Sequence, residues 1–235
     1  TGKAINKLAT DTMKNVTLEL GGKSPVLVLD DANLKKAVPA IARGIFGNTG
    51  QVCVAGSRLY VQRGIYEQAV EMLSKQERSL KMGPGLHPES QIGPLVSAQH
   101  REKVMGYIKA GLEQGAQAVT GGHAIEGPGY YVEPTIFANP SQESKVVQEE
   151  IFGPVQVMIP FDTEEEAIAI ANGTGYGLVD YVNRRRIAHA RDRLRETGHI
   201  AYSCYESGFQ ALAYFYRLFK RHTGQTPGEF IRGRG

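Results

Sequence analysis

The chain has 235 residues, of which 41% are hydrophobic, and it carries a formal net charge of +3 at pH 7. That length is enough for one large or two smaller domains with ordinary hydrophobic cores. No stretch approaches the roughly 18 consecutive apolar residues of a membrane helix, and no leader is apparent, so we expect a cytoplasmic protein without a membrane partner. Cys53 and Cys204 are the two cysteines, which argues against a disulfide in a reducing compartment.

The charge is uneven along the chain. Residues 179–235 hold 11 Lys and Arg against 5 Asp and Glu, a net charge of +6, whereas residues 1–178 have a net charge of −3. A basic tail after a mildly acidic body indicates a polyanion as partner at one end and a small molecule at the other. A solvated basic face is the alternative meaning of the tail.

Strand-like and helix-like segments alternate through residues 1–178. The predicted strands are 16–20, 25–29, 57–62, 118–120, 131–137 and 155–161. Helices are predicted from Asn33, with a kink at Pro39, over 65–80, from Ser97, and over 163–172 with Thr163 as N-cap. This alternation predicts an α/β fold, in which a layered, mostly parallel sheet is flanked by helices.

Cys53 lies in a glycine-rich loop, GNTGQVCVAGSR at 47–58, directly after a predicted helix. A backbone with this many glycines can approach a ligand closely and leave the sulfur accessible, which makes Cys53 a candidate nucleophile. A buried, inert thiol is the alternative, because free cysteine is among the residues most often buried.

Glu19 ends the first predicted strand, directly before Gly21 and Gly22. Binding sites in parallel sheets open where strands end, so this carboxylate could act as a general base if burial raised its pKa toward neutrality. A capping or surface carboxylate is the alternative reading of the same position.

Three motifs occur in a fixed order: LELGGKSP at 18–25, GNTGQVC at 47–53 and EEIFGPV at 149–155. Glu19 precedes Cys53 by 34 positions, and Cys53 precedes Glu150 by 97. Together the three resemble the NAD(P)-dependent aldehyde dehydrogenase superfamily, over residues 1–178. The resemblance implies an oxidoreductase that converts a small-molecule aldehyde to a carboxylic acid, with no metal site.

The resemblance also implies roles for individual residues. Cys53 would attack the aldehyde as a thiolate, and Glu19 would activate the water that hydrolyses the resulting thioester. NAD or NADP would accept the hydride. The cofactor-binding positions implied are Gly2, Leu20, Lys103, Glu150 and Phe152. From the residues alone, Glu150 reads as a surface acid and Phe152 as a core aromatic side chain.

Complete members of this family have an N-terminal coenzyme-binding region ahead of this point, and Gly2 matches the end of its glycine-rich phosphate turn. We therefore expect an incomplete cofactor cradle and weak NAD binding. Relatives of this kind form dimers or tetramers, so a homo-oligomer is a further expectation.

In residues 179–235 the spacing of apolar residues predicts two helices. The first is basic and runs from Tyr181 to Leu194, and the second covers 210–222 and ends at Thr223 and Gly224. The segment YFYRLFKRHTGQTPGEF at 214–230 resembles the C-terminal end of the AraC-type transcription regulators, which carry two helix-turn-helix units. The first of those units is not found here. The stretch 197–208 is one residue short, which predicts a rotation of about 100° for the small helix around Ile200.

The AraC resemblance implies a DNA-facing surface on the second helix. Its base-contacting and phosphate-contacting positions would be Gln210, Ala213, Tyr214, Arg217, Lys220 and Arg221. Half of a DNA-binding domain would bind DNA weakly and with strong salt dependence. A DNA-binding regulator and an inactive fusion fragment are therefore the alternatives to an aldehyde-oxidising enzyme.

Overall fold

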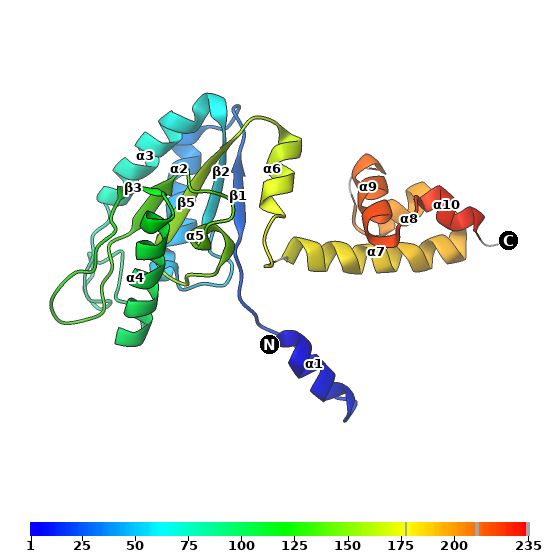
Figure 1. Cartoon of the computed structure of the whole chain (residues 1–235), viewed down its shortest axis with the longest axis horizontal. Coiled ribbons are helices and arrows are strands. Elements are labelled where there is room, and N and C mark those ends of the chain that lie inside the picture. Colours follow the sequence, from blue (N-terminus) through cyan, green and yellow to red (C-terminus); the bar gives the residue numbers. More distant parts are fainter. Residues whose placement is uncertain (177, 210–211, 234–235) are drawn as a thin grey trace. The chain divides into compact units, whose positions relative to one another are not determined.

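The structure, a computed structural model, describes residues 1–176, 178–209 and 212–233. It divides into two compact units, Thr1–Tyr176 and Gly177–Gly235. The elements of each unit are labelled in Figure 1.

A five-stranded sheet, as far as the described residues go, forms the centre of the first unit, with the order β1-β2-β5-β4-β3. Three neighbouring pairs of strands are parallel, and β3 alone runs antiparallel, beside β4. The predicted α/β fold with a mostly parallel sheet is thus confirmed. The strands are β1 (Pro25–Val28), β2 (Arg58–Gln62), β3 (Gln117–Thr120), β4 (Thr135–Ala138) and β5 (Val155–Phe161).

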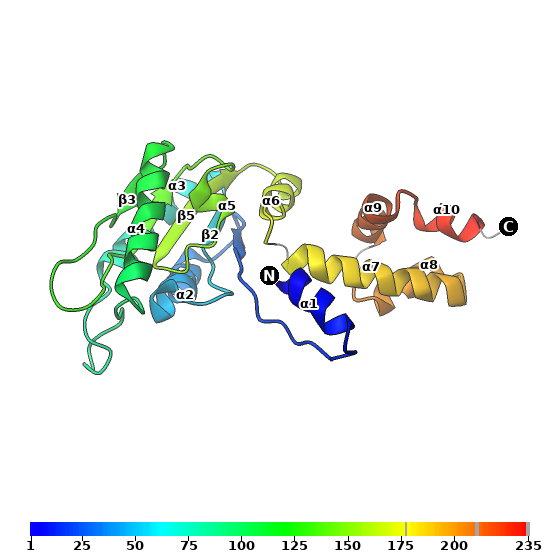
Figure 2. The ribbon, with the colours of Figure 1, turned by 60° about the horizontal axis from the view of Figure 1, so that its bottom comes forward.

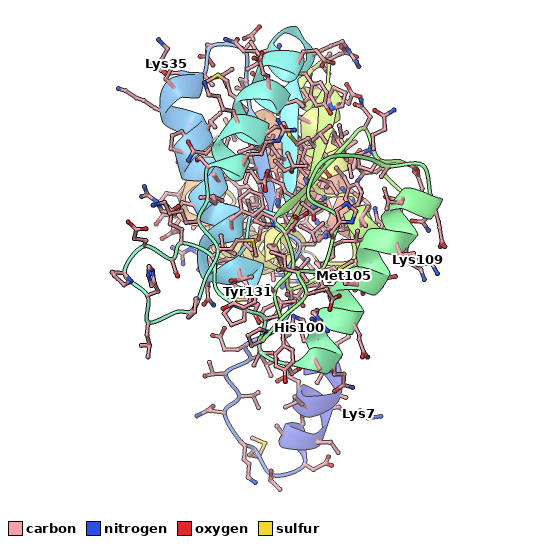
Figure 3. All side chains as sticks on the ribbon, turned by 90° about the vertical axis from the view of Figure 1, so that its left-hand side faces the viewer. Lys7, Lys35, His100, Met105, Lys109 and Tyr131 are labelled. Carbon is pink, nitrogen blue, oxygen red and sulfur yellow. The ribbon has the colours of Figure 1, made fainter. Side chains whose placement is uncertain are left out.

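Helices cover both faces of this sheet. Side chains along a strand alternate between the two faces, so the apolar residues of the strands form a core on each side. Leu59 and Met158 pack into one core with helices α2 and α3, whereas Tyr60 and Val157 point into cores on the other face. In Figure 3 the strands have helices α2 (blue) and α3 (cyan) on one side and helix α4 (green) on the other. The helices are α2 (Leu34–Phe46), α3 (Tyr66–Arg78), α4 (Ala98–Glu113), α5 (Lys145–Gln148) and α6 (Glu164–Ala171).

Three helices begin where the sequence predicts a helix start, and Thr163 is also the predicted N-cap. The side chains of Asn33, Ser97 and Thr163 accept hydrogen bonds from backbone N–H groups at the starts of α2, α4 and α6. These bonds satisfy donors that have no partner within the helix. Helix α2 continues through Pro39 as a single 13-residue element and ends where the cysteine loop begins.

The prediction of a strand over 16–20 is wrong. These residues have no regular secondary structure, and they follow a helix that the sequence did not indicate, α1 (Gly2–Thr10). An alternating pattern forms a strand only when a neighbouring strand accepts its hydrogen bonds, and no described strand pairs with this segment.

The second unit is helical in its described part. It contains α7 (Leu178–Thr197), α8 (Ile200–Glu206), α9 (Leu212–Thr223) and α10 (Pro227–Arg232). Helix α7 contacts the other three. All four helices are labelled in Figure 2. Their shared core includes Leu194, Cys204, Phe215 and Phe219. Helix α8 therefore faces the core with Cys204, despite the short connection that precedes it.

In the described part of the chain, no helix is both long enough and apolar enough to cross a membrane. The same residues contain no cluster of His, Cys, Asp and Glu side chains that could hold a metal ion.

Candidate active site

Three loops of the first unit meet at the turn formed by Gly21 and Gly22. The Gly22 N–H donates a hydrogen bond to Glu150 Oε1 at 2.9 Å. A Cβ atom on Gly22 would lie 2.0 Å from the carbonyl oxygen of Cys53, and one on Gly21 would lie 2.3 Å from Glu150 Oε2. A side chain at Gly22 would clash with the backbone of the cysteine loop, and one at Gly21 would displace the Glu150 carboxylate from its present position.

The residues before Cys53 hold a strained backbone. Asn48, Thr49 and Gly50 all have positive φ, at 51°, 58° and 69°. This conformation is unfavourable for a β-branched residue such as Thr49, whose hydroxyl donates to the carbonyl of Gly93 at 3.1 Å. Gly50 lies against the carbonyl of Gly153, where a Cβ would approach to 2.1 Å. Contacts with two other loops therefore maintain this conformation, whose strain at Thr49 is on the order of 1–3 kcal/mol.

Cys53 is a free, partly buried thiol between this strained segment and β2. The Ala55 N–H donates to the carbonyl of Val52, which closes a tight turn around the cysteine. Cys204 differs from it, since it is fully buried in the core of the second unit and burial raises the pKa of its thiol. Of the two thiols, that of Cys53 is therefore the more accessible.

Glu150 and Phe152 lie on the loop between α5 and β5. Both line a small recess that is also lined by Gly22, Val52 and Gly153. Phe152 has a positive φ of 60° and a side chain that remains 37% exposed. The alternative of a core aromatic residue therefore does not describe Phe152, and Glu150 is half-buried instead of lying free on the surface.

His100 supports the Phe152 backbone, and sequence reasoning missed it. Its Nε2 atom lies 2.6 Å from the Phe152 carbonyl oxygen, and the two rings meet edge to face with centroids 6.0 Å apart. His100 stands in the first turn of α4, as Figure 3 shows. No motif marks this residue, because the contact spans 52 positions of sequence.

Helix α4 also holds the carboxylate next to Glu150. The Tyr107 hydroxyl donates to Glu149 Oε2 at 2.8 Å. Burial, together with this hydrogen bond and the negative charge of Glu149, raises the pKa of Tyr107 to about 12. Lys103, a predicted cofactor contact, is exposed on the same helix with its ammonium 6.0 Å from the Tyr107 ring centroid.

Two buried cations lie beside the glycine turn, and neither was predicted as functional. Arg58 Nε donates to the carbonyl of Lys23 at 2.8 Å, and its other nitrogens donate to the Tyr60 hydroxyl and to the carbonyls of Ile170 and Ala171. The Lys23 side chain is 2% exposed. Burial, with the nearby charge of Arg58, lowers the pKa of Lys23 to about 7, although Glu150 and Glu149 act in the opposite direction.

Glu19 and Leu20 lie outside this cluster of contacts. Both are exposed, and the Glu19 carboxylate makes no hydrogen bond or ion pair with any described residue. Gly2 packs against Leu20, since a Cβ on it would lie 2.7 Å from Leu20 Cδ1. The structure thus joins the loops of Cys53, Glu150 and Phe152 through Gly22, and it leaves Glu19 three residues along the chain from that junction.

Five of the six predicted DNA-facing positions lie on α9. Its core side carries Phe215, Leu218 and Phe219. Tyr214 is half-buried, with its ring centroid 6.2 Å from that of Phe209. Gln210 lies outside the described residues. The remaining predicted positions, all exposed, are Ala213, Arg217, Lys220 and Arg221.

The fold and the site define an α/β domain with a cysteine-bearing loop held beside a glycine turn and a carboxylate. The chain belongs to the aldehyde dehydrogenase family, whose sequence profile matches residues 1–213. A putative aldehyde dehydrogenase, DhaS, of Bacillus subtilis is 45% identical over 207 residues, which are 87% of this chain and 42% of that protein. A betaine aldehyde dehydrogenase of the same organism is 46% identical over 186 residues, 77% of this chain and 38% of that one.

Solved structures give the same assignment. The NAD+ complex of an aldehyde dehydrogenase from Bacillus cereus superposes with a TM-score of 0.72 at 45% identity, over 75% of this chain and 36% of that chain. The chain therefore spans about two fifths of the length of the relatives it matches. The profile match continues past Leu178 into the second unit, as far as the first turn of α9.

Proposed function

We propose that this chain carries the cysteine-bearing part of an NAD(P)-dependent aldehyde dehydrogenase, which oxidises an aldehyde to a carboxylic acid. The observation that carries the proposal is the contact of Gly22 with both the Cys53 carbonyl and the Glu150 carboxylate. These contacts support a site in which the loop of the proposed nucleophile and the loop of Glu150 act together. Membership of the aldehyde dehydrogenase family supports the reaction class.

Cys53 performs the covalent step in this proposal. Its thiolate attacks the aldehyde carbon, and a C–S bond forms as the carbonyl electrons move to oxygen. The backbone N–H of Cys53 stabilises part of the oxyanion. Loss of the aldehyde hydrogen as hydride leaves a thioester on Cys53. NAD or NADP, when bound, supplies the hydride acceptor.

Glu19 completes the cycle. A thioester needs an activated nucleophile for rapid hydrolysis, and a carboxylate can take a proton from water as it attacks. The C–S bond then breaks, which releases the carboxylic acid and the thiol. Glu19 is exposed and precedes by two residues the glycine turn, in which Gly22 lies against the Cys53 carbonyl.

Two residues at the recess support binding of the nicotinamide half of the dinucleotide. The absence of a side chain on Gly21 leaves room for the Glu150 carboxylate, which can accept from a ribose hydroxyl in addition to Gly22. The exposed ring of Phe152 offers a flat apolar surface for an aromatic ring. We assign weaker cofactor contacts to Gly2, Leu20 and Lys103. The proposal also includes a cytoplasmic location and assembly of the chain into a homo-oligomer.

An activated aryl ester tests the nucleophile without cofactor. We expect p-nitrophenyl acetate to acetylate Cys53, as peptide mass spectrometry would show, and Cys53→Ala to abolish the label. Glu19→Gln should leave acetylation intact and slow deacetylation by about 10²–10⁴-fold, the usual contribution of a general base. Cys204→Ala is the matched control, because that thiol is fully buried.

Two results would contradict this assignment. Acetylation of Cys204 in place of Cys53 would remove the nucleophile, and equal deacetylation rates in wild type and Glu19→Gln would remove the base. With the nucleophile established, NAD-dependent oxidation of an aldehyde should disappear in Cys53→Ala. A chain that acetylates but oxidises nothing would fit the alternative of an inactive fragment.

We propose DNA binding by α9 as a second candidate function. One face of the helix packs into the core through Phe215, Leu218 and Phe219, while Arg217, Lys220 and Arg221 are exposed. Short α8 precedes it, so the pair has the order of a helix-turn-helix unit. This arrangement supports the AraC-like reading of residues 179–235.

Fluorescence anisotropy with duplex DNA tests this candidate. We expect Arg217→Ala to weaken binding by about 1–3 kcal/mol, and binding to fall as salt is raised. Lys75→Ala removes an exposed positive charge from α3 in the first unit and should leave binding unchanged. Equal weakening by both substitutions would mean that binding follows net charge alone, which would exclude α9 as a specific DNA-binding surface.

A further inference from the structure

The stretch of chain that leads into α4 is bonded to the cysteine loop at two points. The Thr49 hydroxyl donates to the carbonyl of Gly93 at 3.1 Å, and the Val96 N–H donates to Gln51 Oε1 at 3.0 Å. Val96 precedes the helix, so its N–H is not part of the helical hydrogen-bond pattern and needs another acceptor. Gln51 supplies that acceptor two residues before the proposed nucleophile.

Gln51 also shapes the cysteine loop itself. Its backbone N–H donates to the carbonyl of Asn48 at 3.1 Å, and its own carbonyl accepts from Asn48 Nδ2 at 3.1 Å. These bonds enclose Asn48 and Thr49, which are both non-glycine residues with positive φ. Such residues persist where surrounding contacts fix them. The bond from Val96 to Gln51 therefore ties the strained segment to the start of α4.

The first turn of α4 reaches the second loop of the site through His100. The Ser97 hydroxyl accepts from the His100 N–H at 3.2 Å and so fixes the backbone of that turn. His100 Nε2 lies 2.6 Å from the Phe152 carbonyl oxygen, and because a carbonyl oxygen only accepts, Nε2 is the donor. Phe152 also has a positive φ, of 60°. The same stretch of chain thus contacts a residue of positive φ in each loop.

The two loops also meet each other directly. A Cβ on Gly50 would lie 2.1 Å from the carbonyl oxygen of Gly153, the residue after Phe152. Contacts therefore join the cysteine loop to residues 93–100, residues 93–100 to Phe152, and Gly153 back to Gly50. Leu95, which is 2% exposed and packs in the core with α4, anchors the connecting stretch. A shift of either loop is resisted by the other loop and by this stretch.

We propose that residues 93–100 position the Cys53 loop relative to the Phe152 ring, with Gln51 and His100 as positioning residues. This inference deepens the proposed function and rests on it for its catalytic consequence. In that function the carbon bound to Cys53 must meet a hydride acceptor beside Phe152, and such steps need the reacting atoms about 3–3.5 Å apart. Gln51 and His100 contribute by fixing the two loops that carry these groups.

Amide hydrogen exchange on the full chain, followed by NMR, tests the bond at Gln51. We expect Gln51→Leu to lower the protection factor of the Val96 N–H about 3- to 10-fold, the effect of losing one hydrogen bond. Gln51→Glu keeps an oxygen acceptor and should stay near the wild-type value. Gln62→Leu is the matched control and should leave Val96 unchanged, because Gln62 Oε1 accepts from the Asp30 N–H at 2.9 Å, at the end of β2 away from the cysteine loop.

An effect of one loop on the other tests the positioning itself. His100→Phe keeps a ring beside Phe152 but removes the donor to its carbonyl. We expect this change to lower the protection of the Gln51 N–H, which bonds Asn48 in the cysteine loop, about threefold or more. Lys109→Met should have no such effect, since Lys109 lies on the same helix (Figure 3) with a side chain that is 77% exposed.

Three results would overturn the proposal. Equal Val96 protection in wild type and Gln51→Leu would mean that the bond does not hold the loop, and unchanged Gln51 protection in His100→Phe would make the His100 contact purely local. Amides of β5 should keep their protection in every variant, so an equal fall there would mean a general loss of stability. None of these readouts uses an aldehyde, an ester or NAD, so failure of Cys53 acetylation would refute the proposed function alone.

Discussion

Lys23 and Arg58 show two ways of keeping a positive charge inside the first unit. Arg58 is 1% exposed, yet its guanidinium donates to the carbonyls of Lys23, Ile170 and Ala171 and to the Tyr60 hydroxyl. Its planar, five-donor group suits such a role, because backbone carbonyls replace most of the water it loses. Lys23 has no comparable set of acceptors, and the cost of its burial appears as a lowered pKa.

That lowered pKa predicts a specific dependence of stability on pH. The pKa of Lys23 falls from 10.5 to about 7 on folding, so between these values the unfolded chain binds one more proton than the folded chain. The unfolding free energy of the first unit should therefore rise with pH in this window, by at most about 1.4 kcal/mol per pH unit from this residue. Chemical denaturation at several pH values measures the slope.

The comparison variant for this slope is Lys23→Met, which should be more stable than wild type at pH ~7 and should lose the lysine's part of the rise. Measurements are best kept below pH ~9, because Tyr66 and Tyr107, whose pKa values burial raises to about 12, titrate above that range. Identical slopes in wild type and Lys23→Met would show that Lys23 keeps its proton on folding.

At the scale of elements, helices with a cap and an apolar stripe could be predicted, because both signals are local. Thr163 and Ser97 mark the starts of α6 and α4 as expected. The segment over 16–20 has an equally clear alternating pattern, but a strand depends on a distant partner, which the pattern does not contain. For the same reason the sequence did not reveal that β3 runs antiparallel to β4.

In the candidate site, too, residues in local motifs could be predicted and residues that act through long-range contacts could not. Cys53, Glu150 and Phe152 stand in recognisable motifs, and the structure gathers the loops that carry them around Gly22. The residues that support those loops, His100 and Arg58, could not be predicted. Their roles arise from contacts such as the one between His100 and the Phe152 carbonyl, which lie far apart in sequence.

At the scale of the whole molecule, each compact unit contains its own hydrophobic core. Phe137 belongs to a core of the first unit, with residues of α4, α5 and β5. Phe219 belongs to the core of the second unit, with residues of α7 and α8. Both phenylalanine side chains are fully buried, so they form a matched pair for comparing the two cores.

Separate cores predict two separate unfolding transitions. Phe219→Ala removes a buried aromatic ring that packs edge to face on Phe215 and Phe230, and such a truncation costs about 3–5 kcal/mol. We expect it to lower the midpoint of one calorimetric transition and to leave the other in place, and Phe137→Ala to do the converse. A single transition that both substitutions shift equally would mean that the two units unfold as one cooperative body.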